Sequence, residues 1–263
     1  MMTRGRAVRI ELASIIALLA LWYALTAWLV PFFGTTMAIF FPTPDKIAAA
    51  FGRDFLSTAG LLTIGQTLWR FILGFALSVV LGVGAGLVLG AYPLLYRGFD
   101  PFIGFFRSLP GATLIPALTL LLGLGDTSKI ALIVSAAVWP ILINTVDGAR
   151  AVDPTMRETA AAYQIRRGQA MWRILLPAAA PSIVVGMRVA VSVGLVVTII
   201  SELVGASNGI GGYLVDAQAS FALPRLWAAL LLLSLLGYGL NMLFSAAEHR
   251  WLAWHRGARS FQE

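Results

Sequence analysis

Six long runs of apolar residues follow one another along the chain, separated by more polar stretches. The runs cover residues 10–30, 61–91, 99–122, 128–146, 182–204 and 226–246. About 20 apolar residues in helical conformation cross the hydrocarbon core of a bilayer, and these runs are close to or above that length. The pattern therefore predicts an all-α membrane protein with six transmembrane helices.

Composition supports an integral membrane protein. Hydrophobic residues make up 59% of the chain and charged residues 12%, whereas a soluble domain carries about 25% charged residues. The first run follows the basic start MMTRGRAVR and is too long for the apolar part of a secretory signal, so we expect a retained helix. Cysteine is absent, which excludes disulfides and cysteine-based sites.

The basic residues predict an orientation. The net charge of +7 would suggest nucleic acid for a soluble protein, but here it is better explained by basic loops on the cytoplasmic side, and no nucleic-acid partner is expected. With the N-terminus inside, thirteen Lys and Arg residues fall on inner segments and four on outer ones. We expect both termini in the cytoplasm, an outer loop at 31–60 and an inner tail at 247–263.

The outer loop contains FPTPDKIAAAFGRDF, which is typical of a short helix at the membrane surface. Pro42 and Pro44 mark a turn, and Asp45 is the expected N-cap. One helical face collects the apolar residues Ile47, Ala50, Phe51 and Phe55. The alternative is a linker helix without a role.

Small residues recur every fourth position in two of the runs. One stripe contains Gly74, Ser78, Gly82, Gly86 and Gly90; the other contains Gly186, Ala190, Gly194 and Thr198, and its next step is Glu202. Small residues let helix backbones approach closely in lipid. The stripes predict tightly crossed helices, either within one subunit or between two copies.

Prolines are frequent in or beside the runs, and RSLPGATLIPAL in the third run is the densest case. Proline removes a backbone donor and bends or breaks a helix, and the freed carbonyls need a partner or a water-filled cavity. We expect a broken or re-entrant third span near a pathway, or else a kinked packing helix.

Ionisable residues within spans are candidate functional groups because their burial in lipid is costly. Arg70 and Glu202 lie at similar depth near the outer side, where a pair could gate a pathway or serve structure alone. Arg188 and Asp147 lie near the inner face. The pathway or gate candidates are Arg70, Arg107, Asn144, Arg188, Ser192 and Glu202.

Motifs of enzymatic chemistry are missing from the sequence. No phosphate-binding loop, zinc-protease motif, nucleophile elbow or pair of catalytic carboxylates occurs. We therefore expect a protein that is not an enzyme and binds no metal or cofactor itself. A proton-coupled carrier would usually contain several intramembrane acids or histidines, and Glu202 is the clear case here.

The segment RETAAAYQIRRGQAMWRILLPAAAP is a charged, alanine-rich helix between two membrane runs. Asp153 is the expected N-cap and Pro154 the first helical residue, with the helix continuing to about residue 164. Arg166 and Arg167 would end it, and a more apolar turn would lead to a break at Pro177. Because this loop is predicted to be cytoplasmic and has small residues at 160–162, we expect another protein to dock there.

This loop resembles the EAA loop of ATP-binding-cassette (ABC) importer permeases. The family pattern has E-A-A, a glycine four residues after the second alanine, and later a hydrophobic residue followed by L-P. The matching residues are Glu158, Ala160, Leu176 and Pro177. Thr159 replaces the first alanine, and Gln164 replaces the glycine that usually ends the short helix. That glycine's absence leaves the local turn geometry open.

Five further segments are similar to permeases of the nitrate/sulfonate/taurine type. They are FPTPDKIAAAF, TLWRFILGFALSVVLGVGAGLVLG, DPFIGFFRSLPGATLIPALTLLLGLGDTSKI, ILINTVDGARAVDPTMRETA and SELVGASNGIGGYL. Together with the loop they cover most of residues 41–254, in the same order and with matching spacing.

The resemblance implies a type I importer permease fold in a bacterial inner membrane. It has a five-helix core at 61–246 and a coupling loop at 150–176. Two copies would form the pathway for a small anionic solute of the sulfonate, nitrate or taurine kind, and a periplasmic binding protein would deliver it. Two cytoplasmic ATPases would bind ATP and Mg²⁺. The ATPase-coupling residues would be Glu158, Thr159, Ala160, Ala161, Gln164, Arg166, Arg167 and Pro177. The alternative is an ion- or proton-coupled secondary carrier without an ATPase.

Overall fold

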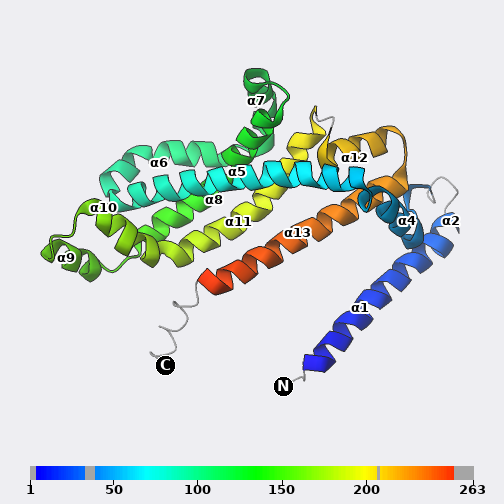
Figure 1. Cartoon of the computed structure of the whole chain (residues 1–263), viewed down its shortest axis with the longest axis horizontal. Helices are drawn as coiled ribbons and strands as arrows, with labels where there is room; N and C mark the ends of the chain where they lie inside the picture. Colours follow the sequence, from blue (N-terminus) through cyan, green and yellow to red (C-terminus); the bar gives the residue numbers. More distant parts are fainter. Residues whose placement is uncertain (1–3, 33–38, 206–207, 252–263) are drawn as a thin grey trace.

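The computed structural model describes residues 4–32, 39–205 and 208–251, and every regular element in these ranges is helical (Figure 1). The elements are α1 (Arg4–Ala24), η1 (Leu25–Leu29), α2 (Val30–Phe32), α4 (Pro44–Phe55), α5 (Thr58–Ala91), α6 (Pro93–Ser108), η2 (Gly111–Leu114), α7 (Ile115–Leu122), α8 (Asp126–Arg150), α9 (Pro154–Ala162), α10 (Arg167–Ala170), η3 (Met171–Leu175), α11 (Leu176–Leu203), α12 (Gly209–Ala219) and α13 (Leu223–Trp251).

Four helices of the described chain are long and apolar enough to cross a membrane: Thr58–Ala91, Asp126–Arg150, Arg167–Leu203 and Leu223–Trp251. The pair formed by Pro93–Ser108 and Gly111–Leu122 gives a fifth span if it is taken as one. The apolar part of α1 and η1, Ile16–Trp28, is shorter than a full span. All-helical architecture is thus confirmed, and the number of crossings is four to five by this criterion.

Helix α8 forms the centre of the bundle and packs against α5 on one side and α11 on the other (Figure 1). The glycines of α5 face it: a Cβ added at Gly74 would lie 2.7 Å from Ile133, and one at Gly86 would lie 2.5 Å from Thr145. Only residues without a side chain permit this approach. The stripe on α5 therefore serves packing within one subunit and not a contact between copies.

The stripe on α11 also faces α8. A Cβ at Gly186 would lie 2.6 Å from the carbonyl oxygen of Pro140, and Ala190 and Thr198 are completely buried. Both stripes thus hold a three-helix core together, which fixes where the polar groups at its two ends lie.

The third apolar run is broken, as its prolines predict. Helix α6 ends at Ser108, Leu109 and Pro110 are extended, and the chain resumes as η2 and α7 after a bend of 88°. Helix α7 projects from the body of the bundle (Figure 1). Pro110 cannot continue α6, and its fixed φ favours the extended turn that starts η2.

The break expected at Pro177 does not occur, so that prediction was wrong. The chain is helical without interruption from Arg167 to Leu203. Pro177 lacks the N–H that an α-helix requires, but the preceding segment Met171–Leu175 is a π-helix whose wider turn ends with the N–H of Leu176 donating to Met171. The wider π turn accommodates the residue that lacks an N–H, so the helix continues through Pro177. The fifth span therefore begins at Arg167, 15 residues before the predicted start at residue 182.

Helix α4 is present, but its cap differs from the expectation. Thr43 is the N-cap, with extended backbone, and Asp45 lies in the first turn. Pro44 takes the first helical position because its missing N–H costs nothing there. The face with Ile47, Ala50 and Phe55 is buried against residues of α12 and α13, so α4 is part of the outer end of the bundle.

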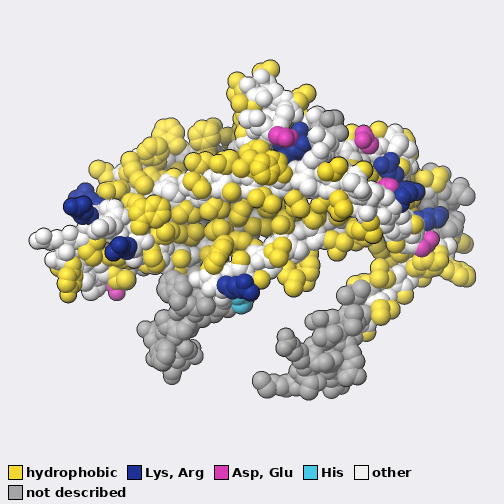
Figure 2. All heavy atoms as spheres, in the orientation of Figure 1, with side chains coloured by type: hydrophobic (Ala, Val, Ile, Leu, Met, Phe, Trp, Pro, Cys, Tyr) yellow, Lys and Arg dark blue, Asp and Glu magenta, His cyan; other side chains and the backbone are white. Residues whose placement is uncertain are grey.

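A broad hydrophobic band crosses the middle of the molecule in the space-filling view (Figure 2). Charged side chains lie toward the end that carries α9 and α10 and the end that carries α4 and α12, and two further groups lie beside the band, below α7 and near the end of α13 (Figures 1 and 2). Such a distribution fits a bilayer across the middle, with polar groups at both ends.

Candidate functional site

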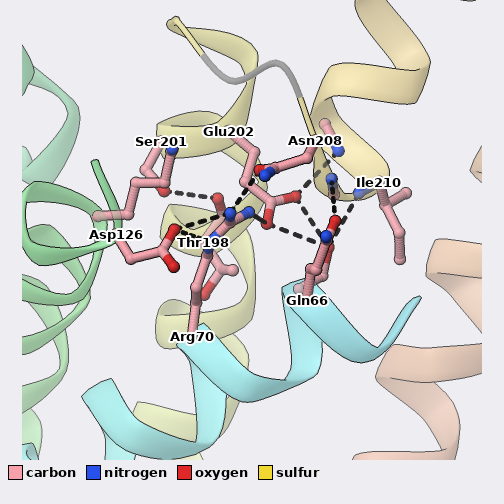
Figure 3. A network of polar contacts seen from close by, with 12 residues as sticks. Gln66, Arg70, Asp126, Thr198, Ser201, Glu202, Asn208 and Ile210 are labelled. Atoms are coloured by element: carbon pink, nitrogen blue, oxygen red, sulfur yellow. Dashed lines mark hydrogen bonds and ion pairs between the residues drawn. The ribbon is translucent and has the colours of Figure 1, made fainter. Parts of the chain in front are cut away.

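A buried ion-pair network at one end of the core joins α5, α8, α11 and the segment before α12 (Figure 3). The Arg70 guanidinium is 2% exposed and donates through Nη1 to Oε1 of Glu202 at 2.5 Å. It also donates through Nε to Oδ1 of Asp126 at 2.8 Å and through Nη2 to the side-chain oxygen of Asn208. Arg70 and Glu202 thus form the pair that their similar depth predicts.

The Glu202 carboxylate is completely buried and has further donors. The Thr67 hydroxyl lies 2.9 Å from Oε2, and the N–H of Gly211 donates to the same oxygen at 3.0 Å. Buried charges are tolerated when they are paired and hydrogen-bonded in this way. The network is therefore fully satisfied around Glu202.

The first three amides of α12 are fixed by side chains of other helices. The N–H of Gly209 donates to Gln66, that of Ile210 to the Thr67 hydroxyl, and that of Gly211 to Glu202. These groups have no partner within α12, and a carboxylate at this position also interacts favourably with the helix dipole. The network thus positions α12 on the core.

Lys129, one of the four basic residues that the orientation rule places on the outer side, belongs to the same region, and it was not among the predicted site residues. It is 5% exposed, and its Nζ donates to the carbonyl oxygen of Leu124 at 3.1 Å. Asp126, one helical turn earlier, is an exposed member of the network, with 54% of its side chain accessible. The Asp–Lys spacing of three residues at the start of α8 was the available signal.

The other predicted pathway residues do not gather around this network. Arg107 is exposed in the last turn of α6, and Ser192 is exposed on α11. Asn144 is half-buried and donates to the carbonyl oxygen of Pro140 at 2.8 Å, within its own helix. Arg188 forms an ion pair with Glu248 of α13, while Asp147 is exposed on α8.

A second polar cluster, absent from the sequence-based candidates, holds α4 against α12 and α13. Asp54 accepts from the Tyr213 hydroxyl at 2.5 Å and from Nε of Arg225 at 3.0 Å, and also pairs with Arg53. Burial favours a higher pKa for Asp54, but hydrogen bonds from Tyr213, Arg53 and Arg225 outweigh it, and the pKa lies below its ordinary value. Burial and the Asp54 carboxylate raise the pKa of Tyr213 to about 12.

Helix α9, in the charged loop, begins as predicted. Asp153 is its N-cap, and its Oδ1 accepts from the N–H of Thr155 at 2.8 Å. This hydrogen bond from the backbone lowers the pKa of Asp153. Pro154 occupies the first helical position, and α9 ends at Ala162.

The end of α9 shows how the chain turns without the family's usual glycine. Gln164 has φ +52°, in the left-handed region that favours glycine. The N–H of Ile165 donates to Ala160 and that of Gln164 to Ala161, which is the hydrogen-bond pattern of a Schellman cap. The backbone thus makes the same kind of turn without glycine, and the left-handed conformation of Gln164 is unfavourable for a residue with a side chain.

Most of the predicted docking residues are exposed at this end of the molecule. Glu158, Thr159, Ala161, Gln164, Arg166 and Arg167 are exposed, and so is Pro177. Ala160 differs: it is 7% exposed and lies with Ile174 along a cavity of about 320 Å³ beside α9. Ala160 therefore faces the protein's own loop.

Comparison with known proteins identifies relatives among transport proteins. The family model for the binding-protein-dependent transport system inner membrane component matches residues 78–252. The taurine transport system permease protein TauC of Escherichia coli (strain K12) is 25% identical over 95% of this chain and 91% of that protein. The nitrate import permease protein NrtB of Synechocystis sp. is 28% identical over 71% of this chain and 68% of that protein.

Among solved structures, the fold is similar to that of a chain of the MetNI methionine ABC transporter in an inward-facing conformation. The TM-score is 0.64 with 19% identity, and the match covers 73% of this chain and 95% of that chain. At this identity the likeness concerns the fold of the helical core.

Proposed function

Because the chain belongs to the family of binding-protein-dependent transport system inner membrane components, we propose that it is the membrane-spanning subunit of an ATP-driven importer for a small anion. Two copies form the pathway, two cytoplasmic ATPases bind ATP and Mg²⁺, and a periplasmic binding protein delivers the solute. The chain crosses the inner membrane six times when α1 is included, with both termini in the cytoplasm. It carries out no catalysis itself.

The geometry of α9 is the single observation that carries this proposal. The helix is short, capped at both ends and exposed along Glu158, Thr159 and Ala161. It is connected to α8 by the short segment 151–153 and, through residues 163–166, to the continuous helix Arg167–Leu203. A force applied to α9 therefore reaches two helices of the packed core directly, as a coupling helix requires.

In this proposal the Arg70–Glu202 pair stabilises the packed helices and does not separate in each transport cycle. Both side chains are buried, and Glu202 also holds Thr67 and the start of α12. Separation of the pair would leave a buried charge without its partner, which costs about 3–5 kcal/mol. A moving gate would more easily use a contact at the surface of this network, such as the ion pair of Arg70 with the exposed Asp126.

The substrate class rests on the relatives and on charge. One relative is named for taurine and one for nitrate, and both solutes carry an acidic or anionic group. Arg107 and Arg188 are exposed basic side chains of membrane helices and could meet such a group. A sulfonate, nitrate or similar small anion is the solute we propose.

The alternative is a secondary carrier driven by an ion or proton gradient, and purification distinguishes the two. The chain, expressed with its neighbouring genes, should co-purify with an ATPase. Proteoliposomes with the binding protein outside should accumulate solute only when ATP is enclosed. Uptake that continues without ATP and stops when ion gradients are abolished would contradict the proposal.

A further inference from the structure

One face of α11 is exposed between residues 185 and 196 and contains polar residues. Val185, Val189 and Val196 are 54%, 46% and 57% exposed, and Ser192 on the same face is exposed as well. The Arg188 side chain, beside them, is 49% exposed. The opposite face of the helix packs on α8 through residues such as Ala190.

The exposed face of α5 provides a contrast within the same bundle. Between residues 69 and 88, every exposed residue of α5 is apolar, including Trp69, Ile72 and Val80. That surface suits lipid chains. A half-exposed arginine does not, because a charged group in contact with the hydrocarbon core is strongly unfavourable. The face of α11 with Arg188 and Ser192 therefore meets water or a polar ligand.

Helix α13 supplies a second polar row beside this face. Asn241, Ser245 and Glu248 are spaced by four and three residues, so they share one side of α13. Glu248, which is 20% exposed, forms an ion pair with Nη2 of Arg188. The Glu248 carboxylate thus pairs with one nitrogen of the Arg188 guanidinium, and the rest of the Arg188 side chain remains accessible.

We propose that Arg188 is the side chain that binds the anionic group of the transported solute, and that Glu248 is its resident counter-ion, displaced when the anion arrives. This rests on the proposed function and names the residue that selects for anions. A guanidinium matches the oxygens of a sulfonate, nitrate or carboxylate with parallel hydrogen bonds. When the solute displaces Glu248, one anion replaces another, so the charge balance at Arg188 does not change. The Glu248 carboxylate can then move into water, because Glu248 lies in the last two turns of α13.

The absence of cysteine from the chain allows a direct test. Ser192→Cys is introduced into the full chain, expressed with its partner subunits in membrane vesicles. Its modification rates are measured with two methanethiosulfonates, the anionic sulfonatoethyl and the cationic trimethylammonioethyl reagent. Ile72→Cys on α5 is the matched control for a face in lipid.

Ser192→Cys should react with both reagents and Ile72→Cys with neither. The ratio of anionic to cationic rates at Ser192→Cys should fall at least about tenfold when Arg188→Gln is added, because one positive charge attracts one reagent and repels the other. Glu248→Gln should raise the ratio, and Arg188→Lys should preserve it. Methanesulfonate or nitrate should slow modification when Arg188 is present and not in Arg188→Gln.

Unreactive Ser192→Cys, or a rate ratio that Arg188→Gln leaves unchanged, would overturn the assignment. Neither result would affect the proposed function, because these rates require no ATP hydrolysis. Conversely, uptake without ATP in the unmodified protein would refute the proposed function whatever the rate ratios are. If Arg188→Gln alone reduces the amount of folded protein, the double variant Arg188→Gln/Glu248→Gln removes both charges. The ratio should then fall less than in Arg188→Gln, because loss of the carboxylate offsets part of the loss of the guanidinium, and methanesulfonate should no longer slow modification.

Discussion

The carboxylate of Glu202 occupies the place where residue 209 would carry a side chain. A Cβ built on Gly209 would lie 2.5 Å from Oε1 of Glu202, and Gly209 has φ +84°. Glycine is required here both by the close approach and by the left-handed backbone. The start of α12 and the buried ion pair are thus one structural unit.

Gly209→Ala should destabilise the protein by about 1–3 kcal/mol, since it adds both backbone strain and a clash with a buried carboxylate. The measurement is thermal unfolding in detergent. Gly84→Ala is the control, because nothing lies within 4 Å of a Cβ at this helical position. That substitution should be neutral or stabilise by up to about 1 kcal/mol. Equal effects of the two substitutions would contradict the role assigned to Gly209.

Removal of one partner of the Arg70–Glu202 pair should be more damaging than removal of both. Glu202→Gln leaves the buried Arg70 with only Asp126 as its counter-ion and should cost about 3–5 kcal/mol. In Arg70→Met/Glu202→Gln no charge is left unpaired at the centre, so the loss should be smaller than the sum of the single losses. A double-mutant cycle on unfolding free energies tests this, and strict additivity would show that the two side chains do not interact.

Gln164→Gly should stabilise the turn after α9 by about 1 kcal/mol, because Gln164 has a positive φ that glycine adopts without strain. Hydrogen exchange of the amides of Gln164 and Ile165, which form the cap, should become slower. Gln169→Gly, in the ordinary helix α10, should have the opposite sign. Faster exchange in Gln164→Gly would contradict the assigned geometry.

The Asp54 cluster should make the outer end of the bundle sensitive to acid. The pKa of Asp54 is lower in the folded protein than the ordinary value of about 3.9, so its stabilising effect is complete above that value and is lost as the pH falls through the folded pKa. The difference in melting temperature between the unmodified protein and Asp54→Asn should therefore be constant from pH 7 to 5 and shrink below pH 4. A difference that grows on acidification would contradict the sign.

Much of the architecture could be predicted from the sequence because lipid imposes simple rules. Apolar length located the long helices, small residues at every fourth position located the packed faces, and Pro110 located the break after α6. The Arg70–Glu202 pair followed from depth alone. Each of these signals depends on positions along a helix and not on contacts between distant segments.

What could not be predicted depends on contacts between distant segments or on compensation within the backbone. Pro177 does not break its helix because the π turn at Met171–Leu175 takes up the missing hydrogen bond. Asp54 is drawn into its cluster by Tyr213 and Arg225, which are far away in sequence. Arg188 has its partner on α13 and not on α8, which only the relative placement of three helices determines.

The central claim is that a cytoplasmic ATPase docks on α9, and crosslinking tests it most directly. A photoreactive phenylalanine is placed at Thr159, which is exposed on α9, and in a separate variant at Leu120, which is 87% exposed on the projecting helix α7. Both variants are illuminated in membranes that contain the whole transport system. We predict that Thr159 crosslinks to the ATPase subunit and Leu120 does not. Crosslinking to the ATPase from Leu120 and none from Thr159 would contradict the account.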